Sequence, residues 1–422
     1  MAQPNTKRLS LRRFATPPDS ELSTQEHERP LTLCVSGGGM RSFSCAVGQF
    51  RALEDTGLMD RVSMISAVSG GAWASLAYSW LPAADTSRRA HLGDALSPDL
   101  LSLPLLDTLV EPGHLAYPIT QVSSVTIARE LADLKMSPVE RYARFIERGF
   151  IAPAHDYPPH FMLSDGATHT ARILAANPSL TREDLLERPA RLPEVTIGAT
   201  LIVEHNDAPN DYLHVHLNPR SAWVADGPRH YHLDEELLLG LPVSPEQDAH
   251  FEVDVPAHGF DLACHWATTG GAMGGALVEI TQRLGITDHG FALRAHPWFM
   301  EGRPNIAVAH LVDGGYVDNT GVVAAVLSGK RDLLICVNTD RAVGAAGTTN
   351  LLGLGGQISH LFGRPTASGM YAASKLKLFE SEQLEDLSEA LHHSQSEGVL
   401  PHAATTHRIA KDNSFGLPPD EV

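Results

Sequence analysis

The sequence is short of cysteine, of long apolar runs and of positive charge. Only four cysteines occur among 422 residues, so we expect buried free thiols and a reducing, cytoplasmic location. No apolar run reaches the roughly 18 residues that a membrane-spanning helix needs. Lys and Arg total 32 against 50 Asp and Glu, a net charge of −18. This balance argues against nucleic acid as a partner and against simple electrostatic adhesion to anionic membranes.

The ends and the middle of the chain differ in composition. Residues 1–30 carry basic side chains but no apolar core, so they are not a secretory signal, and we expect a disordered leader. Residues 31–422 are long enough for one large domain. Residues of about 82–193 and 218–256 are polar and rich in proline. We expect lid or insertion segments there, through which any membrane contact would be peripheral.

Glycine-rich turns follow directly on two apolar runs. Leu31–Val35 reads as a buried strand and leads into Gly37-Gly38-Gly39, after which apolar residues recur at helical spacing. Val62–Val68 reads as a second strand and ends on Ser69-Gly70-Gly71. The pattern predicts two turns at the carboxyl ends of neighbouring parallel strands, where open α/β sheets place their chemistry.

The two turns offer complementary chemical groups. The backbone N–H groups of Gly38, Gly39 and Met40 would lie at a helix N-terminus, which suits negative charge. Ser69 would present its hydroxyl on a sharp strand-to-helix bend, where the N–H of Gly70 also faces a developing oxyanion. Together the turns predict a nucleophile beside an oxyanion hole.

A third turn of this kind lies late in the chain. Ile306–Val312 reads as a strand that ends on Asp313-Gly314-Gly315. A helical pattern begins near Val322, and another strand is expected at Leu333–Val337. An aspartate released from a strand end into a double-glycine turn repeats the arrangement of the first two sites. We therefore expect Asp313 to share the crevice with the serine.

The three turns, in this order, resemble the patatin-like phospholipases. The matching stretches read S-G-G-G-M-R at 36–41, V-S-G-G at 68–71 and D-G-G at 313–315, and their wording is closest to the cytosolic phospholipase A2 branch. The resemblance implies a three-layer α/β/α fold with a mainly parallel central sheet and helical insertions. Two positions depart from the pattern. Ala67 replaces the glycine usual two residues before the serine, and Ser42 stands where alanine or glycine is common.

The resemblance also implies a catalytic dyad without histidine. Ser69 matches the nucleophile, Asp313 the base, and the amides of Gly38 and Gly39 the oxyanion loop. Arg41 matches the arginine that assists at the oxyanion or at the phosphate head group. The implied activity is hydrolysis of a phospholipid or lysophospholipid ester through an acyl-serine, with no cofactor and no metal.

Other functions remain open at this stage. A transacylase would use the same residues, and a catalytically silent lipid-binding or scaffold protein would keep the same fold. An α/β-hydrolase triad would need Ser69, Asp313 and one late histidine. The candidates for that histidine are His360, His392, His393, His402 and His407.

Two further motifs receive ordinary interpretations. The stretch His214-x-His216 lies on an expected strand, and its neighbours that could complete a metal site are His230, His232, Asp234 and Glu235. We interpret this set as a polar patch, with a metal site as the alternative. The first glycine turn does not follow G-x-G-x-x-G and lacks an acidic ribose ligand after the next strand, so we do not expect a dinucleotide there.

Overall fold

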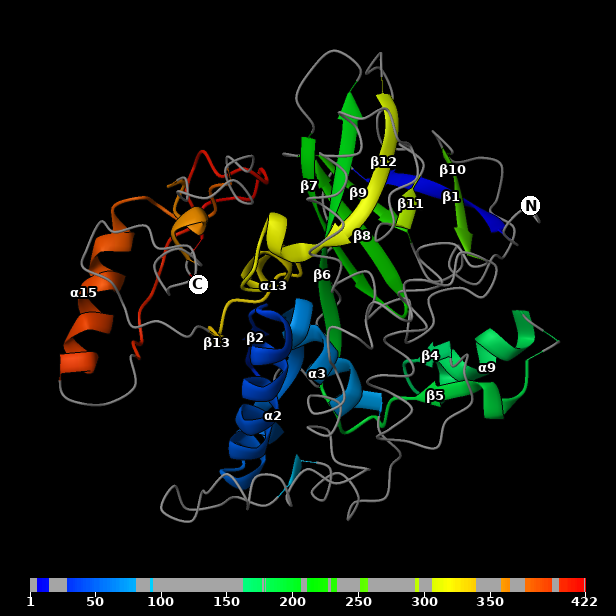
Figure 1. Cartoon of the computed structure of the whole chain (residues 1–422), viewed down its shortest axis with the longest axis horizontal. Coiled ribbons are helices and arrows are strands. Elements are labelled where there is room, and N and C mark those ends of the chain that lie inside the picture. The colour runs from blue at the N-terminus through cyan, green and yellow to red at the C-terminus, as the bar shows by residue number, and fades with distance from the viewer. Residues whose placement is uncertain are drawn as a thin grey trace, which may run out of the picture.

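The computed structural model (Figure 1) describes most of the predicted strands and both of the first two turns. The described residues are 6–14, 29–80, 92–93, 162–176, 178, 180–205, 211–226, 229–233, 251–256, 293–295, 306–338, 358–364, 376–396, 402–420 and 422. The strands are β1 (Thr6–Phe14), β2 (Leu31–Val35), β3 (Val62–Val68), β4 (Met162–Ser164), β5 (Leu185–Glu187), β6 (Glu194–His205), β7 (Asp211–Asn218), β8 (Ser221–Asp226), β9 (Arg229–Leu233), β10 (Phe251–Pro256), β11 (Leu293–Ala295), β12 (Ile306–Asp313) and β13 (Leu333–Cys336). The α-helices are α2 (Gly39–Asp55), α3 (Ser69–Trp80), α9 (Ala167–Ala176), α13 (Val322–Leu327) and α15 (Gln383–Ser396). Short 3-10 turns are η1 (Met59–Arg61), η4 (Arg182–Asp184), η5 (Gly314–Tyr316) and η6 (Ser359–Leu361).

The parallel part of the main sheet carries the first two predicted turns. Its strands lie in the order β13-β2-β3-β6, and each neighbouring pair is parallel. Successive residues of β2 face opposite sides, because Cys34 packs in one apolar cluster and Val35 in another. An α/β fold with parallel strands under the glycine and serine turns is therefore as predicted.

Antiparallel strands extend this sheet beyond β6. The order β10-β1-β9-β8-β7 continues from that strand, and β12 also pairs with β6 in the antiparallel sense. Strands β8, β9 and β10 fall within residues 218–256, so the insertion expected there contributes three strands to the main sheet.

Helices cover both faces of the parallel strands and make a three-layer arrangement. On one face lie α2 and α3, whose apolar side chains join those of β3 and β6 in one cluster. On the other face, α13 packs with residues of the C-terminal part of the chain, including side chains of α15. Figure 1 shows α13 between α15 and the strands β6, β7 and β12.

The two helices of the first layer differ in how they are buried. In α2 the predicted stripe of Phe43, Ala46, Val47, Phe50 and Leu53 is buried, and the opposite side faces outward. In α3 every residue is buried. The side chains of this helix are small or largely apolar on all of its sides, so no side needs to face water. The second helix therefore forms the interior of this layer, and it holds the serine turn in a dry environment.

Residues near the N-terminus form a strand, which corrects the expectation of a wholly disordered leader. Strand β1 pairs antiparallel with β10 and with β9. Its register sets Leu9 opposite Val253 and Leu11 opposite Phe251. The alternation of apolar and polar residues in this short stretch is typical of a strand, but it becomes stable only with partners that lie far away in sequence.

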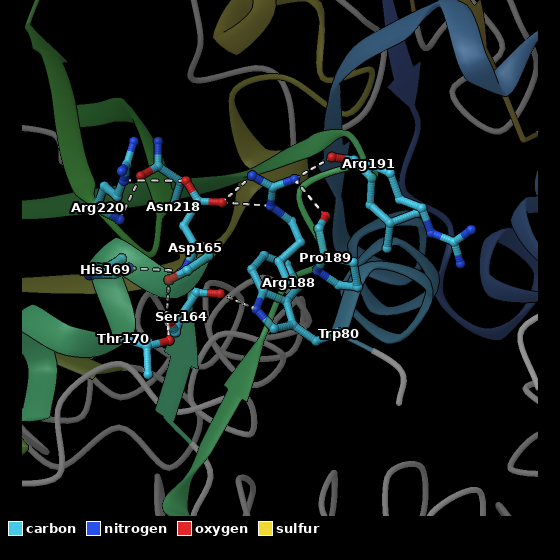
Figure 2. Close-up of polar contacts among 12 residues, drawn as sticks. Trp80, Ser164, Asp165, His169, Thr170, Arg188, Pro189, Arg191, Asn218 and Arg220 are labelled. Carbon is cyan, nitrogen blue, oxygen red and sulfur yellow. Dashed lines mark hydrogen bonds and ion pairs between the residues drawn. The ribbon is translucent and has the colours of Figure 1, made fainter. Parts of the chain in front are cut away.

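A small unit of β4, α9 and β5 docks below the main sheet through the Asp165 cluster, a set of buried polar contacts (Figure 2). Arg188 Nε donates to Asp165 Oδ1 at 2.6 Å, and Arg220 Nε lies 3.3 Å from Asp165 Oδ2. Trp80, at the end of α3, donates its indole N–H to the carbonyl oxygen of Ser164 at 3.0 Å. The described part of residues 82–193 is therefore attached near the last residue of α3 and near the turn between β7 and β8, whereas Ser69 is the first residue of α3.

The cysteine prediction is only partly confirmed. Cys34 is a buried free thiol, Cys336 is half-buried, and Cys45 is exposed on the outer side of α2, where the sequence analysis had placed it inside. Burial raises the pKa of Cys34 well above its ordinary value and that of Cys336 to about 11, so both are protonated thiols near neutral pH. Cys264 lies outside the described residues. None of the helices in the described ranges combines the length and apolar character needed to cross a bilayer.

Candidate active site

Two strands meet end to end at the site. Val68, the last residue of β3, pairs with Gly198 of β6, and Asp313, the last residue of β12, pairs with the next residue, Ala199. The opposite edge of β6 is occupied by β7 along these residues, so β3 and β12 share one edge and run toward each other. Because β12 is antiparallel to β6, Asp313 reaches the site from the direction opposite to the one expected for a parallel strand.

Ser69 occupies a sharp turn of the kind predicted for a nucleophile. It follows β3 without a spacer and begins α3. Its φ of 51° makes it the only residue other than glycine with a positive φ among those the structure describes. A non-glycine residue in this region carries strain of about 1 to 3 kcal/mol, and such strain is typical of functional turns.

The glycines after the serine are required by close packing. A Cβ atom on Gly70 would lie 1.9 Å from the carbonyl oxygen of Gly39, and one on Gly71 would lie 2.6 Å from that of Ser36. The serine turn and the glycine loop are thus pressed together, backbone against backbone. Ala67, where glycine was expected, is fully buried and pairs normally with Val35 and Ile197, so the departure does not prevent the turn.

Asp313 places a buried carboxyl group beside the serine. Its side chain is 3% exposed, and its Oδ1 accepts a hydrogen bond from the N–H of Gly315 at 2.8 Å. Burial raises its pKa to about 6, although the Gly315 N–H and the hydroxyl of Ser69 both favour the ionised form. Oδ2 is buried and has no hydrogen-bond partner among the described residues. The structure therefore brings the predicted pair together.

The glycine loop has the conformation that only glycine adopts easily. Gly38 has a φ of 146° and Gly39 a φ of 61°, and α2 begins at the second of these residues. The N–H of Gly37 donates to the carbonyl oxygen of Asn319 at 2.8 Å. A Cβ atom on Gly37 would lie 3.0 Å from Cβ of Ser69. The loop thus lies directly beside the serine, with the backbone of Gly38, Gly39 and Met40 at the start of the helix.

A network around Asn338 supports the loop from the end of β13. The Asn338 amide group donates to Ser42 Oγ at 3.0 Å and accepts from Gln49 Nε2 at 2.8 Å. Ser42 in turn donates to the carbonyl oxygen of Ser36, which gives this unexpected serine a structural role. Arg41 Nη2 lies 3.4 Å from the Asn338 carbonyl oxygen and would lie 3.1 Å from a Cβ atom on Gly38. The guanidinium group therefore folds back over the glycine loop.

Sequence reasoning missed two residues at the meeting point of the strands. Gly198 interrupts β6 where β3 and β12 end, and a Cβ atom there would lie 2.9 Å from Val68 Cγ2. Asn319 places its side-chain oxygen between Gly37 and Gly315, where Cβ atoms would lie 2.1 Å and 2.9 Å from it. A glycine inside an otherwise β-branched strand is the signal that could have identified Gly198.

Two of the candidate histidines, His360 and His407, contact groups other than Asp313. His360 Nε2 lies 3.4 Å from Oδ1 of Asp318, and His407 contacts the rings of Phe362 and Phe379. No histidine is among the groups that shift the pKa of Asp313. Ser69, Asp313 and histidine therefore do not form a hydrogen-bonded chain within the described part of the molecule.

The histidine pair on β7 does not assemble a metal site with the residues that the structure describes. His214 and His216 are both buried, and their rings lie 5.9 Å apart. His216 stacks on Trp223, and His214 lies edge-on to Phe415. No group of three potential ligands is close enough to hold a metal within the described ranges. The side chains of His230 and His232, and all of Asp234 and Glu235, lie outside those ranges.

Comparison with known proteins agrees with the predicted resemblance. Solved structures of human GIVD cytosolic phospholipase A2 are similar at 15% identity and a TM-score of 0.40, over 73% of this chain and 45% of that one. The same protein in complex with methyl gamma-linolenyl fluorophosphonate inhibitor and terbium chloride gives 17% identity and a TM-score of 0.34, over 73% and 40%. This chain thus spans less than half the length of those structures, and no curated protein sequence matches it. Residues 33–215 match the family model of the patatin-like phospholipases.

Proposed function

We propose that the protein is a lipid acyl hydrolase that cleaves a carboxylic ester with Ser69 as nucleophile and Asp313 as base. The observation that carries the proposal is the pairing of a serine held at positive φ with a buried carboxyl group whose ionised form the serine hydroxyl favours. The family match of residues 33–215 supports the same class of reaction.

In the first half of the reaction the ester becomes an acyl-serine. Ser69 Oγ attacks the carbonyl carbon while its proton passes to Asp313. The tetrahedral intermediate then collapses, the bond to the alcohol oxygen breaks, and the proton on Asp313 moves to the leaving alcohol. A carboxylate with a pKa of about 6 suits this task, because it is ionised near pH 7 and still accepts a proton readily.

Backbone amides are proposed to stabilise the negative charge on the carbonyl oxygen. The candidate donors are the N–H groups of Gly38, Gly39 and Met40, at the start of α2, and of Gly70, at the start of α3. A helix N-terminus adds partial positive charge, and donors of this kind contribute about 3 to 4 kcal/mol each to the transition state in other serine hydrolases.

In the second half water replaces the alcohol. Asp313 takes a proton from water as the water oxygen attacks the acyl carbon. The intermediate releases the fatty acid, and the proton returns to Ser69 Oγ. Arg41 is proposed to bind the phosphate head group or to assist at the oxyanion, since its guanidinium group lies over Gly38.

Labelling with a fluorophosphonate probe, followed by peptide mapping, tests the nucleophile without a known substrate. We expect the label on Ser69 in the wild type and none in Ser69→Ala. Hydrolysis of phospholipid and lysophospholipid vesicles is then compared among the wild type, S69A and D313A. Equal turnover by all three proteins would refute the proposal.

A further inference from the structure

Asp318, five residues after Asp313, forms a buried acid–histidine pair with His360. Asp318 is 0% exposed and His360 is 2% exposed, and Oδ1 of the first lies 3.4 Å from Nε2 of the second. Burial opposes ionisation of Asp318, but the hydrogen bond and charge of His360, together with Thr320, lower its pKa to about 2. A carboxylate without a proton can only accept hydrogen bonds, so Nε2 of His360 must be the donor.

The Asp318 carboxylate also organises the chain on its C-terminal side. Its Oδ1 accepts from the backbone N–H of Thr320 at 2.8 Å and from the Thr320 hydroxyl at 2.5 Å. Its Oδ2 accepts from the N–H of Val323 at 2.8 Å, in the first turn of α13. Gly321 is the N-cap residue of α13, and Asp318 fixes the path of the chain into this helix by accepting an N–H of its first turn.

The same residue is tied to the turn that carries the proposed base. The N–H of Asp318 donates to the carbonyl oxygen of Gly314 at 2.9 Å, and Thr200 Oγ1 donates to that same oxygen at 3.3 Å. Asp313 precedes Gly314 directly. Any displacement of Asp318 would therefore be transmitted through one hydrogen bond to the residue next to the base.

The segment that follows Asp313 also holds the other two turns. The carbonyl oxygen of Asn319 accepts the N–H of Gly37 in the glycine loop at 2.8 Å. The carbonyl oxygen of Gly321 accepts the hydroxyl of Ser66 at 2.6 Å, on the strand that presents Ser69. Residues 313–321 thus form the link through which all three turns keep their relative positions.

We infer that His360 is a positioning residue for acyl transfer: through Asp318 it holds residues 313–321, and with them the base and the glycine loop, in the reactive arrangement. The inference rests on the proposed Ser69–Asp313 function. It assigns to His360 a role different from that of a triad histidine, because the imidazole contacts Asp318 and not the base. His360 comes from the C-terminal layer, where Leu361 and Phe362 anchor it in the apolar cluster around α13.

Burst kinetics with a p-nitrophenyl ester can separate this role from simple structural support. In His360→Ala we expect the acylation rate constant to fall about 100-fold with KM little changed, as for a small misplacement of reacting groups. His360→Gln should recover most of the loss, since its amide N–H can donate to Asp318. The side chain of His360→Asn is one methylene shorter than that of H360Q and should not reach Asp318, so this variant should resemble H360A. H360N therefore replaces H360A in the comparison if H360A does not fold.

His407→Ala is the matched control. His407 lies in the same layer, with its ring 5.3 Å from that of Phe362, but it does not contact Asp318. We expect H407A to lose thermal stability and to keep the wild-type acylation rate. The inference would be overturned if H360A acylated at the wild-type rate, or if H360Q acylated no faster than H360A. In either case the wild type would still be labelled by the fluorophosphonate at Ser69, so the proposed function would stand. A wild type whose Ser69 is not labelled would instead refute the proposed function itself.

Discussion

Val68 and Asp313 pair with consecutive residues of β6, on the same edge of that strand. Two strands that approach each other in this way cannot both continue, so each must leave the sheet at the point where they meet. The chain leaves the sheet through the serine turn at the end of β3 and through the aspartate turn at the end of β12. Their proximity is therefore fixed by the register of the sheet, and not by the flexible packing of loops, which is the kind of support that a preorganised site needs.

The close packing at this meeting point predicts a specific steric effect. A Cβ atom on Gly314 would lie 2.5 Å from the carbonyl oxygen of Gly198, which is backbone and cannot move aside easily. We expect Gly314→Ala to lower the free energy of unfolding by about 1 to 3 kcal/mol and to slow acylation. Denaturant unfolding and burst kinetics measure the two effects.

Gly48→Ala is the control for that substitution. Gly48 lies inside α2, and nothing stands within 4 Å of the position that its Cβ would take. We expect this change to raise stability by about 0.5 to 1 kcal/mol, because alanine is the better helix former. If G314A proved as stable and as active as G48A, the close packing of Gly314 against Gly198 would be contradicted.

The backbone strain at Ser69 predicts a difference between two inactive variants. Both Ser69→Ala and Ser69→Gly remove the hydroxyl, so neither should take up a fluorophosphonate label. Glycine adopts a φ of 51° without the steric penalty that a Cβ atom brings. We expect S69G to be about 1 kcal/mol more stable than S69A in chemical denaturation, and an equal stability of the two would contradict the strained turn.

The buried state of Asp313 predicts how activity depends on pH. The proposed base works only when ionised, and its pKa is raised to about 6. We therefore expect kcat/KM for a neutral ester to rise with pH through a midpoint near 6 and to level off above it. An ester without titratable groups is the suitable substrate. A midpoint near 4, the ordinary value of an aspartate, would contradict the buried environment.

The raised pKa of Asp313 also predicts that its ionised carboxylate lowers the stability of the folded protein at neutral pH. Between pH 3.8 and about 6 the folded state holds a proton that the unfolded state has released, so stability falls as pH rises through this window. Asp313→Asn removes the penalty. We expect D313N to exceed the wild type by about 2 to 3 kcal/mol at pH 7, and the difference to disappear below pH 4. Thermal unfolding across this pH range measures it, and a D313N less stable than the wild type at pH 7 would contradict the sign.

Much of the site was predictable because its signals are local. The glycine loop, the serine turn and the aspartate turn each show a strand that ends in residues suited to positive φ or to close backbone approach. The buried stripe of α2 follows from helical spacing alone. Each of these features depends on side chains within a few positions of one another.

Features that depend on distant partners could not be predicted. The apolar run Ile306–Val312 indicates a strand but not its direction, so its antiparallel pairing with β6 was not foreseen. The contact of Asp318 with His360 joins segments that share no sequence pattern. Strand β1 needs β9 and β10, and its alternation is too short to predict this pairing.

The Asp165 cluster of Figure 2 predicts a large loss of stability without loss of chemistry. The side chains of Arg188 and Asp165 are 8% and 9% exposed, so Arg188→Ala would leave a buried carboxylate whose ion pair with Arg220, at 3.3 Å, involves a side chain that is 47% exposed. We expect a loss of about 3 kcal/mol. Arg182→Ala is the control, because its ion pair with Glu187 involves a side chain that is 73% exposed and should contribute less than about 1 kcal/mol. Both variants should keep the wild-type acylation rate below their unfolding temperatures, since the cluster contacts the last residue of α3 and Ser69 is the first residue of that helix. A slower burst in folded R188A would mean that the β4–α9–β5 unit reaches the site through contacts other than those described.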